Sequence, residues 1–176
     1  MQIAVLSGKG GTGKTTVATN LALNIENTIL ADADVEEPNS HIFLKPEITK
    51  TIEVTKAYPK VNYKKCDFCG KCGDFCRYNA ILPTKKSVIV MQEACHDCGG
   101  CALVCPNNAI EYTPREIGKI YGGKSIYKNL DIYYGLLNIG ELSGVRIIED
   151  LRELLPKDKI AIIDSPPGTS CATVAA

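Results

Sequence analysis

A glycine-rich segment near the start of the chain constrains the fold more than any other feature. Gly8, Gly13, Lys14 and Thr15 have the spacing G-x-x-x-x-G-K-[ST] of a phosphate-binding loop. The loop follows a short apolar run and precedes a helical stretch at residues 17–25, so we expect a strand, a loop and a helix in that order. A turn that only joined a strand to a helix would need neither the lysine nor the threonine. The segment therefore predicts an α/β nucleotide-binding domain.

The residues of this loop have distinct expected roles. Glycines allow a tight turn in which several backbone N–H groups point at a polyphosphate, and the positive end of the next helix adds to that field. Lys14 is expected to reach the β- and γ-phosphates, and the Thr15 hydroxyl to bind Mg²⁺. The predicted nucleotide-binding residues of the loop are Gly8, Lys9, Gly10, Gly11, Thr12, Gly13, Lys14, Thr15 and Thr16.

Acidic residues follow two further predicted strands. Residues 28–30 lead into Asp32 and Asp34, and a predicted strand at residues 159–163, apolar from Ile160 on, ends at Asp164. Carboxylates in such places suit a Mg²⁺–phosphate site. They equally suit an ordinary polar loop, and a strand that ends in aspartate is common. The residues alone leave both interpretations open.

Eight of the nine cysteines form two runs with the same spacing, C-x₂-C-x₂-C-x₃-C, related by a shift of 29 residues. The runs also share a glycine and the tail Asn-Ala-Ile, which indicates an internal duplication. A phosphate loop belongs in a reducing compartment, so these cysteines predict a metal site rather than disulfides. Zinc is the competing metal, although a zinc site uses four ligands in two separated pairs. The runs are Cys66, Cys69, Cys72, Cys76 and Cys95, Cys98, Cys101, Cys105, and Cys171 is left over.

With Lys9 directly after Gly8, the loop reads K-G-G-T-G-K-T and resembles that of the deviant Walker A ATPases. This is the family of MinD, ParA, the nitrogenase iron protein and the Mrp-type iron–sulfur carriers. The pattern D-x-D-x-x-x-P-N from Asp32 and the pattern D-x-P-x-G from Asp164 resemble the two switch segments of the same family. The resemblance implies ATP as the nucleotide and an ATP-sandwich homodimer, in which Lys9 reaches the nucleotide of the partner subunit.

The same resemblance implies roles for the acidic residues. Asp34 would orient or deprotonate the attacking water, and the Mg²⁺ shell would involve Thr15, Asp32 and Asp164. The N–H of Gly168 would sense the γ-phosphate. The implied catalytic residues are Lys9, Lys14, Asp34 and Asp164.

The cysteine runs resemble those of the bacterial two-cluster ferredoxins, over roughly residues 60–112. In that arrangement the fourth cysteine of each run ligates the other cluster. The resemblance therefore implies two 4Fe–4S clusters. One would be held by Cys66, Cys69, Cys72 and Cys105, and the other by Cys95, Cys98, Cys101 and Cys76. One departure is Arg77, which follows Cys76 where such ferredoxins usually carry proline. Its charge would tend to raise the potential of the second cluster.

These patterns together predict an α/β P-loop NTPase, with a parallel sheet flanked by helices, interrupted by an α+β ferredoxin-like 2[4Fe–4S] domain. The expected domains are residues 1–57 and 113–176 for the ATPase and 58–112 for the insert. We count about four strands in the ATPase part and a helix at 145–155 capped by Ser143. The sheet of the family has more strands, so the chain is expected to be C-terminally truncated.

The whole chain resembles MinD-superfamily ATPases that carry an inserted ferredoxin domain. The expected function is ATP binding and hydrolysis that gates electron transfer through the clusters to a partner protein. The alternative is an ATP-dependent assembly factor or carrier for iron–sulfur clusters or metallocofactors. Twenty basic and twenty acidic residues balance, so nothing predicts a nucleic-acid partner, and no apolar run predicts a membrane span. We expect a cytoplasmic protein.

The lysines at residues 45–65 predict a solvated face or, alternatively, a docking surface for an acidic electron-transfer partner.

Overall fold

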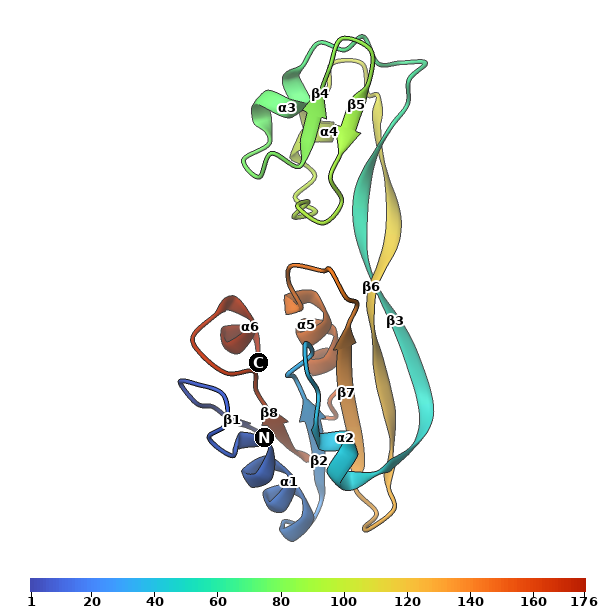
Figure 1. Ribbon diagram of the computed structural model, residues 1–176. Coiled ribbons are helices and arrows are strands. Elements are labelled where there is room, and N and C mark those ends of the chain that lie inside the picture. Colours follow the sequence, from blue (N-terminus) through green and yellow to red (C-terminus); the bar gives the residue numbers. More distant parts are fainter. The chain divides into compact units, whose positions relative to one another are not determined.

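The computed structural model describes residues 1–176 and divides them into two compact units. Unit 1 comprises Met1–Val54 and Ile117–Ala176, and unit 2 comprises Thr55–Glu116. The junctions predicted from the sequence, 57/58 and 112/113, lie a few residues from the boundaries between these units. Two strands of 16 residues, β3 (Pro46–Val61) and β6 (Ile110–Ser125), run through both junctions without a break (Figure 1). A change in composition cannot mark a boundary within a continuous strand.

Unit 1 is built on a six-stranded sheet in the order β1-β8-β2-β7-β6-β3. The first four strands are parallel: β1 (Gln2–Val5), β8 (Ile160–Asp164), β2 (Thr28–Asp32) and β7 (Asp131–Leu137). This confirms the α/β prediction with its parallel sheet. Strand β6 pairs with β7 in the antiparallel direction. Because parallel strands end at the same edge, Val5, Asp32 and Asp164 share one level of the sheet.

Strands β6 and β3 were not predicted from the sequence as long strands. Glycines in the second half of β6 obscure its pattern, and the structure explains two of them. A Cβ at Gly118 would lie 2.3 Å from the carbonyl oxygen of Leu136, and a Cβ at Gly123 would lie 2.1 Å from that of Glu47. Only glycine therefore permits these close backbone approaches.

The helices of unit 1 are α1 (Lys14–Asn24), α2 (Ser40–Leu44), α5 (Val145–Glu153) and α6 (Cys171–Ala175). Ala18 and Ala22 of α1 pack on a core that includes Leu30, Ile132 and Ile162. Helix α5 buries Ile147, Ile148 and Leu151, as expected for its amphipathic pattern. The N-cap position is occupied by Gly144, one residue after the predicted Ser143. The Ser143 hydroxyl nevertheless accepts a hydrogen bond from the N–H of Val145, the first residue of the helix (3.4 Å).

Unit 2 contains two short helices, α3 (Lys71–Phe75) and α4 (Gly100–Leu103), and the antiparallel pair β4 (Ile81–Pro83) and β5 (Val88–Val90). Its backbone repeats in the same way as its sequence. Residues with positive φ recur 29 positions apart, because the duplicated turns need the left-handed region at equivalent places. These pairs are Phe68 and Asp97, Gly70 and Gly99, and Asn79 and Asn108.

Candidate functional site

The predicted phosphate loop lies between β1 and α1, at the carboxyl end of its strand. Gly11 and Gly13 have φ values of 71° and 87°, which strongly favour glycine. The Ser7 hydroxyl donates a hydrogen bond to the carbonyl oxygen of Lys9 (2.8 Å), which closes the first turn of the loop. Helix α1 begins at Lys14, three residues earlier than predicted, so its first turn is part of the loop.

An open pocket of about 440 Å³ lies at this end of the sheet. Gly10 to Thr16 form one wall, which includes the predicted Lys14 and Thr15. The other wall includes Asp34, from the loop after β2, and Pro167, from the loop after β8. Gly8 and Lys9 do not line the pocket, and Lys9 is exposed. The lining also contains Glu37, Asn39, Ile42 and Phe43.

Asp164 ends β8 with a buried, unpartnered carboxylate. The residue is 1 % exposed, and neither side-chain oxygen has a hydrogen-bond partner. Burial raises its pKa to about 6, and the nearby Thr15 hydroxyl acts in the opposite direction and lowers the pKa. A buried carboxylate without partners costs free energy unless a cation is close. Its position beside the phosphate loop therefore fits a hydrated Mg²⁺ ion.

The structure gives Asp32 a different environment. Its carboxylate accepts hydrogen bonds from the backbone N–H groups of Asp34 (3.1 Å), Asn39 (3.0 Å) and Ser40 (2.9 Å). Burial nevertheless raises its pKa above the ordinary value. These bonds hold the loop that carries Asp34 in place. This role of Asp32 was not predicted from the sequence, where the family resemblance implied that Asp32 takes part in the Mg²⁺ shell.

Asp34 is half-buried at the rim of the pocket. Burial, and then the charge of Asp32, raise its pKa to about 6, while the charge of Lys14 lowers it. A carboxylate with a pKa near neutrality can accept a proton from water more readily than an ordinary aspartate. The position and the pKa both suit the role that the family resemblance implied.

The loop after β8 is tied to the phosphate loop through Gly168. Its N–H donates to the carbonyl oxygen of Ser7 (3.0 Å), and its φ of 91° is in the left-handed region. This bond would have to break before the same N–H could contact a γ-phosphate. On the other side, the N–H of Ala33 donates to the carbonyl oxygen of Asp164 (2.8 Å). The three loops are thus joined by backbone hydrogen bonds.

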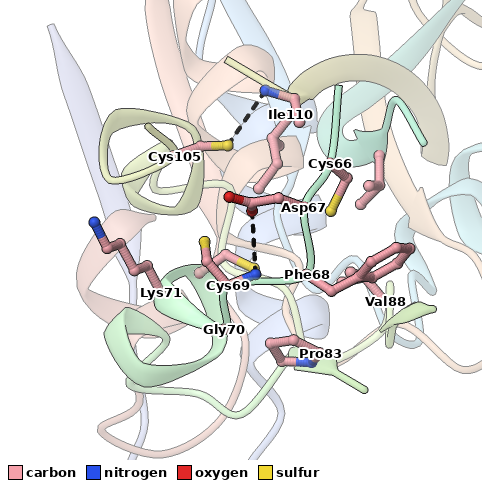
Figure 2. Close-up of a pocket in the computed structure, with 13 residues that line it drawn as sticks. Cys66, Asp67, Phe68, Cys69, Gly70, Lys71, Pro83, Val88, Cys105 and Ile110 are labelled. Atoms are coloured by element: carbon pink, nitrogen blue, oxygen red, sulfur yellow. Dashed lines mark hydrogen bonds between the residues drawn. The ribbon is translucent and has the colours of Figure 1, made fainter. Parts of the chain in front are cut away.

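The cysteines of unit 2 line two separate pockets, four to each. The first pocket is lined by Cys66, Cys69, Cys72 and Cys105, with apolar walls that include Phe68, Val88 and Ile110 (Figure 2). The second is lined by Cys76, Cys95, Cys98 and Cys101, with Tyr78, Arg77 and Tyr112 among its walls. Each pocket takes three cysteines from one run and the last cysteine from the other run.

The last cysteine of each run is held by an equivalent backbone contact. The N–H of Ala80 donates to the sulfur of Cys76 (3.3 Å), and the N–H of Ala109 donates to the sulfur of Cys105 (3.2 Å). All nine cysteines are free thiols. No three or more His, Cys, Asp or Glu side chains are grouped as they would be around a single metal ion. Burial raises the pKa of the Cys72 and Cys95 thiols, so ligation there would have to release protons.

Two features of the nucleotide pocket were not foreseen from the sequence. Ile42 and Phe43 of α2 line it with side chains that are 58 % and 56 % exposed. Behind them, the rings of His41 and Tyr134 are stacked with centroids 4.7 Å apart. Each residue is ordinary in a short apolar helix or strand, so the sequence held no signal that distinguished them.

The carboxyl edge of the unit 1 sheet is thus organised as in a P-loop nucleotide-binding protein. A family model, "CbiA: CobQ/CobB/MinD/ParA nucleotide binding domain", matches residues 3–164. The chain belongs to this family. The predicted membership of the MinD/ParA group of P-loop proteins is confirmed, while the ferredoxin nature of unit 2 stays a prediction.

Two curated relatives come from Methanocaldococcus jannaschii. The uncharacterized protein MJ0578 is 39 % identical over 99 % of this chain, and the uncharacterized protein MJ0579 is 33 % identical over 100 %. The chain spans 62 % and 65 % of their lengths. Among solved structures, the septum site-determining protein MinD of Pyrococcus horikoshii, complexed with Mg-ADP, is similar with a TM-score of 0.50 and 18 % identity. That match covers 99 % of this chain and 52 % of MinD, and it supports the fold alone.

None of the helices has the length and apolar character that crossing a membrane requires.

The raised pKa of Asp164 predicts a pH-dependent loss of stability. Its pKa rises from the ordinary 3.8 to about 6 in the folded chain. Between these values the folded state holds a proton that the unfolded state releases, so the free energy of unfolding falls as the pH rises through this window. Asp164→Asn should remove this cost and raise the free energy of unfolding at pH 7 by about 2 kcal/mol, with no gain at pH 3.

Urea unfolding followed by circular dichroism, without Mg²⁺ and nucleotide, measures the effect. Asp158→Asn, at an exposed position in the turn before β8, is the matched control and should change little. If Asp164→Asn destabilises the protein at pH 7, the carboxylate contributes to stability. That result would contradict the assignment of Asp164 as a residue that faces a metal ion.

Proposed function

We propose that the protein binds Mg²⁺–ATP in unit 1 and two 4Fe–4S clusters in unit 2, and that ATP binding and hydrolysis gate electron transfer to a partner protein. The observation that carries the proposal is the division of eight cysteines into two pockets of four, next in the chain to a P-loop domain. The apolar pocket walls suit a cluster, because exclusion of water protects it and tunes its potential. When bound, the clusters supply one-electron chemistry.

In unit 1, Lys14 and the backbone N–H groups of the loop would hold the phosphates. Thr15 and Asp164 would hold the Mg²⁺ ion, because the unpartnered Asp164 carboxylate lies beside Thr15. Asp34 would orient the attacking water and accept its proton. The exposed Lys9 would be free to reach the nucleotide of a second subunit, which supports the proposed homodimer.

The link between ATP and the clusters would begin in the loop after β2. This loop leads into α2, and β3 begins two residues after α2 ends. The N–H of Leu137, the last residue of β7, donates to the carbonyl oxygen of Val35 in the same loop (2.8 Å), and the Ser125 hydroxyl donates to that of Leu44 (2.8 Å). The strands that continue into unit 2 are therefore linked to this loop indirectly. Strand β3 follows α2 in the chain, and β6 is bonded to the end of α2 through Ser125 and pairs with β7, which is bonded to Val35.

A redox titration tests this coupling. Coupling between two sites is usually about 1–3 kcal/mol, which corresponds to a shift of about 40 to 130 mV in a one-electron potential. We expect a shift of this size when a non-hydrolysable ATP analogue is added to the full-length protein, and no shift in Lys14→Ala. Superimposable titrations in a protein that binds both ATP and iron would mean that the nucleotide does not gate the clusters.

The second candidate function is delivery of clusters to other proteins. Cys69 of the first pocket and Cys98 of the second are exposed, and exposed ligands favour cluster release. Transfer of iron and sulfide to an apo-acceptor, rather than reversible redox cycling with retained iron, would favour this candidate.

A further inference from the structure

The hairpin of unit 2 has one apolar face that is not covered. Leu82 of β4 and Ile89 of β5 are direct partners in the antiparallel pair, and their side chains are 43 % and 52 % exposed. Direct partners point to the same side of a sheet, so these two form a single apolar patch. Their neighbours Ile81 and Val88 point to the other side and are buried in the core of unit 2, where Val88 lines the first cysteine pocket and Ile81 lines the second.

Exposed lysines lie in the two segments next to this patch. Lys85 and Lys86 lie in the turn that joins β4 to β5. The Tyr63 hydroxyl is within hydrogen-bonding distance of both the carbonyl oxygen (3.2 Å) and the N–H (3.4 Å) of Val88. This contact holds the segment with Lys64 and Lys65, also exposed, against β5. Lys71 lines the first pocket itself (Figure 2).

Basic residues outnumber acidic residues in unit 2. Residues 55–116 contain nine lysines and arginines and six acidic residues. Five of the nine basic residues are the lysines just described. Each pocket is lined by one lysine or arginine, Lys71 in the first and Arg77 in the second. The acidic residue next to the first pocket, Asp67, directs its carboxylate at the N–H of Cys69 (3.2 Å).

We propose that the lysine-rimmed hairpin face is the docking surface for an acidic redox protein. We define this face as Leu82 and Ile89 with Lys64, Lys65, Lys85 and Lys86. An apolar centre with a charged rim is typical of protein–protein interfaces, and complementary charge steers such encounters. The proposal rests on the proposed function, because it makes the first pocket the point of electron entry. One electron leaves the reduced partner, which is oxidised, and reduces the cluster held there, and no bond forms or breaks.

The test compares three reconstituted proteins of the full chain. The docking variant carries Lys64→Glu, Lys85→Glu and Lys86→Glu. The charge control carries Lys45→Glu, Lys60→Glu and Lys157→Glu, which reverse three exposed lysines outside the face. The probe is an acidic 2Fe–2S ferredoxin. Its Kd is measured by calorimetry at low ionic strength with both proteins oxidised, and its rate of electron transfer is measured by stopped flow with the probe reduced.

The docking variant should bind the ferredoxin about tenfold or more weakly and accept electrons correspondingly slowly, while the charge control behaves as the wild type. The wild-type rate should fall with added salt, and that of the docking variant should not. Equal binding by all three proteins would overturn the proposal. Lysine-dependent binding to anionic vesicles or RNA, without binding to the ferredoxin, would also overturn it. Iron analysis separates the two hypotheses: a chain without iron refutes the proposed function, whereas an iron-loaded chain with unaffected docking refutes this surface alone.

Discussion

Replacing Lys14 with alanine should abolish nucleotide binding, because the loop loses the lysine that lines its pocket and is expected to contact the phosphates. A charge-assisted hydrogen bond to a phosphate in a cradle of backbone N–H groups is a large part of the affinity, so we expect a loss of at least about 100-fold. The measurement is equilibrium binding of a fluorescent ATP analogue in the presence of Mg²⁺.

Lys9→Ala is the matched control, since it removes a lysine from the same loop that does not line the pocket. This variant should bind the nucleotide as the wild type does but lose ATP hydrolysis and nucleotide-dependent dimerisation. Sedimentation with and without the analogue reports the dimer. If both variants hydrolyse ATP at the wild-type rate, the predicted roles of the two lysines are wrong.

Replacing Cys105 with serine should halve the iron content. Two 4Fe–4S clusters predict about eight irons and eight sulfides per chain after anaerobic reconstitution. Cys105 lines the first pocket, so its loss should remove that cluster and leave about four irons. Cys171→Ser changes an exposed cysteine of α6 in unit 1 and should leave the iron unchanged.

Two double variants decide which cysteines act together. Cys66→Ser with Cys105→Ser removes two residues of one pocket and should leave about four irons. Cys95→Ser with Cys105→Ser removes one residue from each pocket and should leave little iron. If the second pair keeps about four irons, each run ligates its own cluster. Zinc at one or two ions per chain, without iron, would contradict the cluster assignment altogether.

Much of unit 1 was predictable because its signals are local. The strand before Gly8, the glycines of the loop and the helix after Lys14 lie within one continuous stretch, and local backbone preferences largely determine their structure. The apolar strand that ends at Asp164 could likewise be predicted from a short, continuous stretch of sequence. The spacing of the cysteines and their duplication can also be seen in the sequence. The backbone conformation of unit 2 repeats at the same interval.

The chain order could not show which distant residues meet. Asp32 and Asp164 are aligned only because β2 and β8 are neighbours in the sheet, and burial at that edge is what raises the pKa of Asp164. The chain order also could not show that three backbone N–H groups donate hydrogen bonds to the Asp32 carboxylate. These donors belong to a loop that folds back onto the end of β2. The extent of β6 was hidden because glycines that allow close packing weaken its strand pattern.

The sequence by itself determined the kind of chemistry: a loop for phosphates, acids at strand ends and eight thiols in two repeated runs. How these residues are grouped depends on the tertiary structure. It places Cys105 with Cys66 and Cys76 with Cys95, a grouping that the residues alone left open and that the ferredoxin resemblance implied. It also assembles the lysine-rimmed hairpin face from two segments joined by the Tyr63 hydroxyl. The physical reason is that residue types fix what a side chain can bind, whereas long-range packing and strand pairing fix which side chains lie within reach of one another.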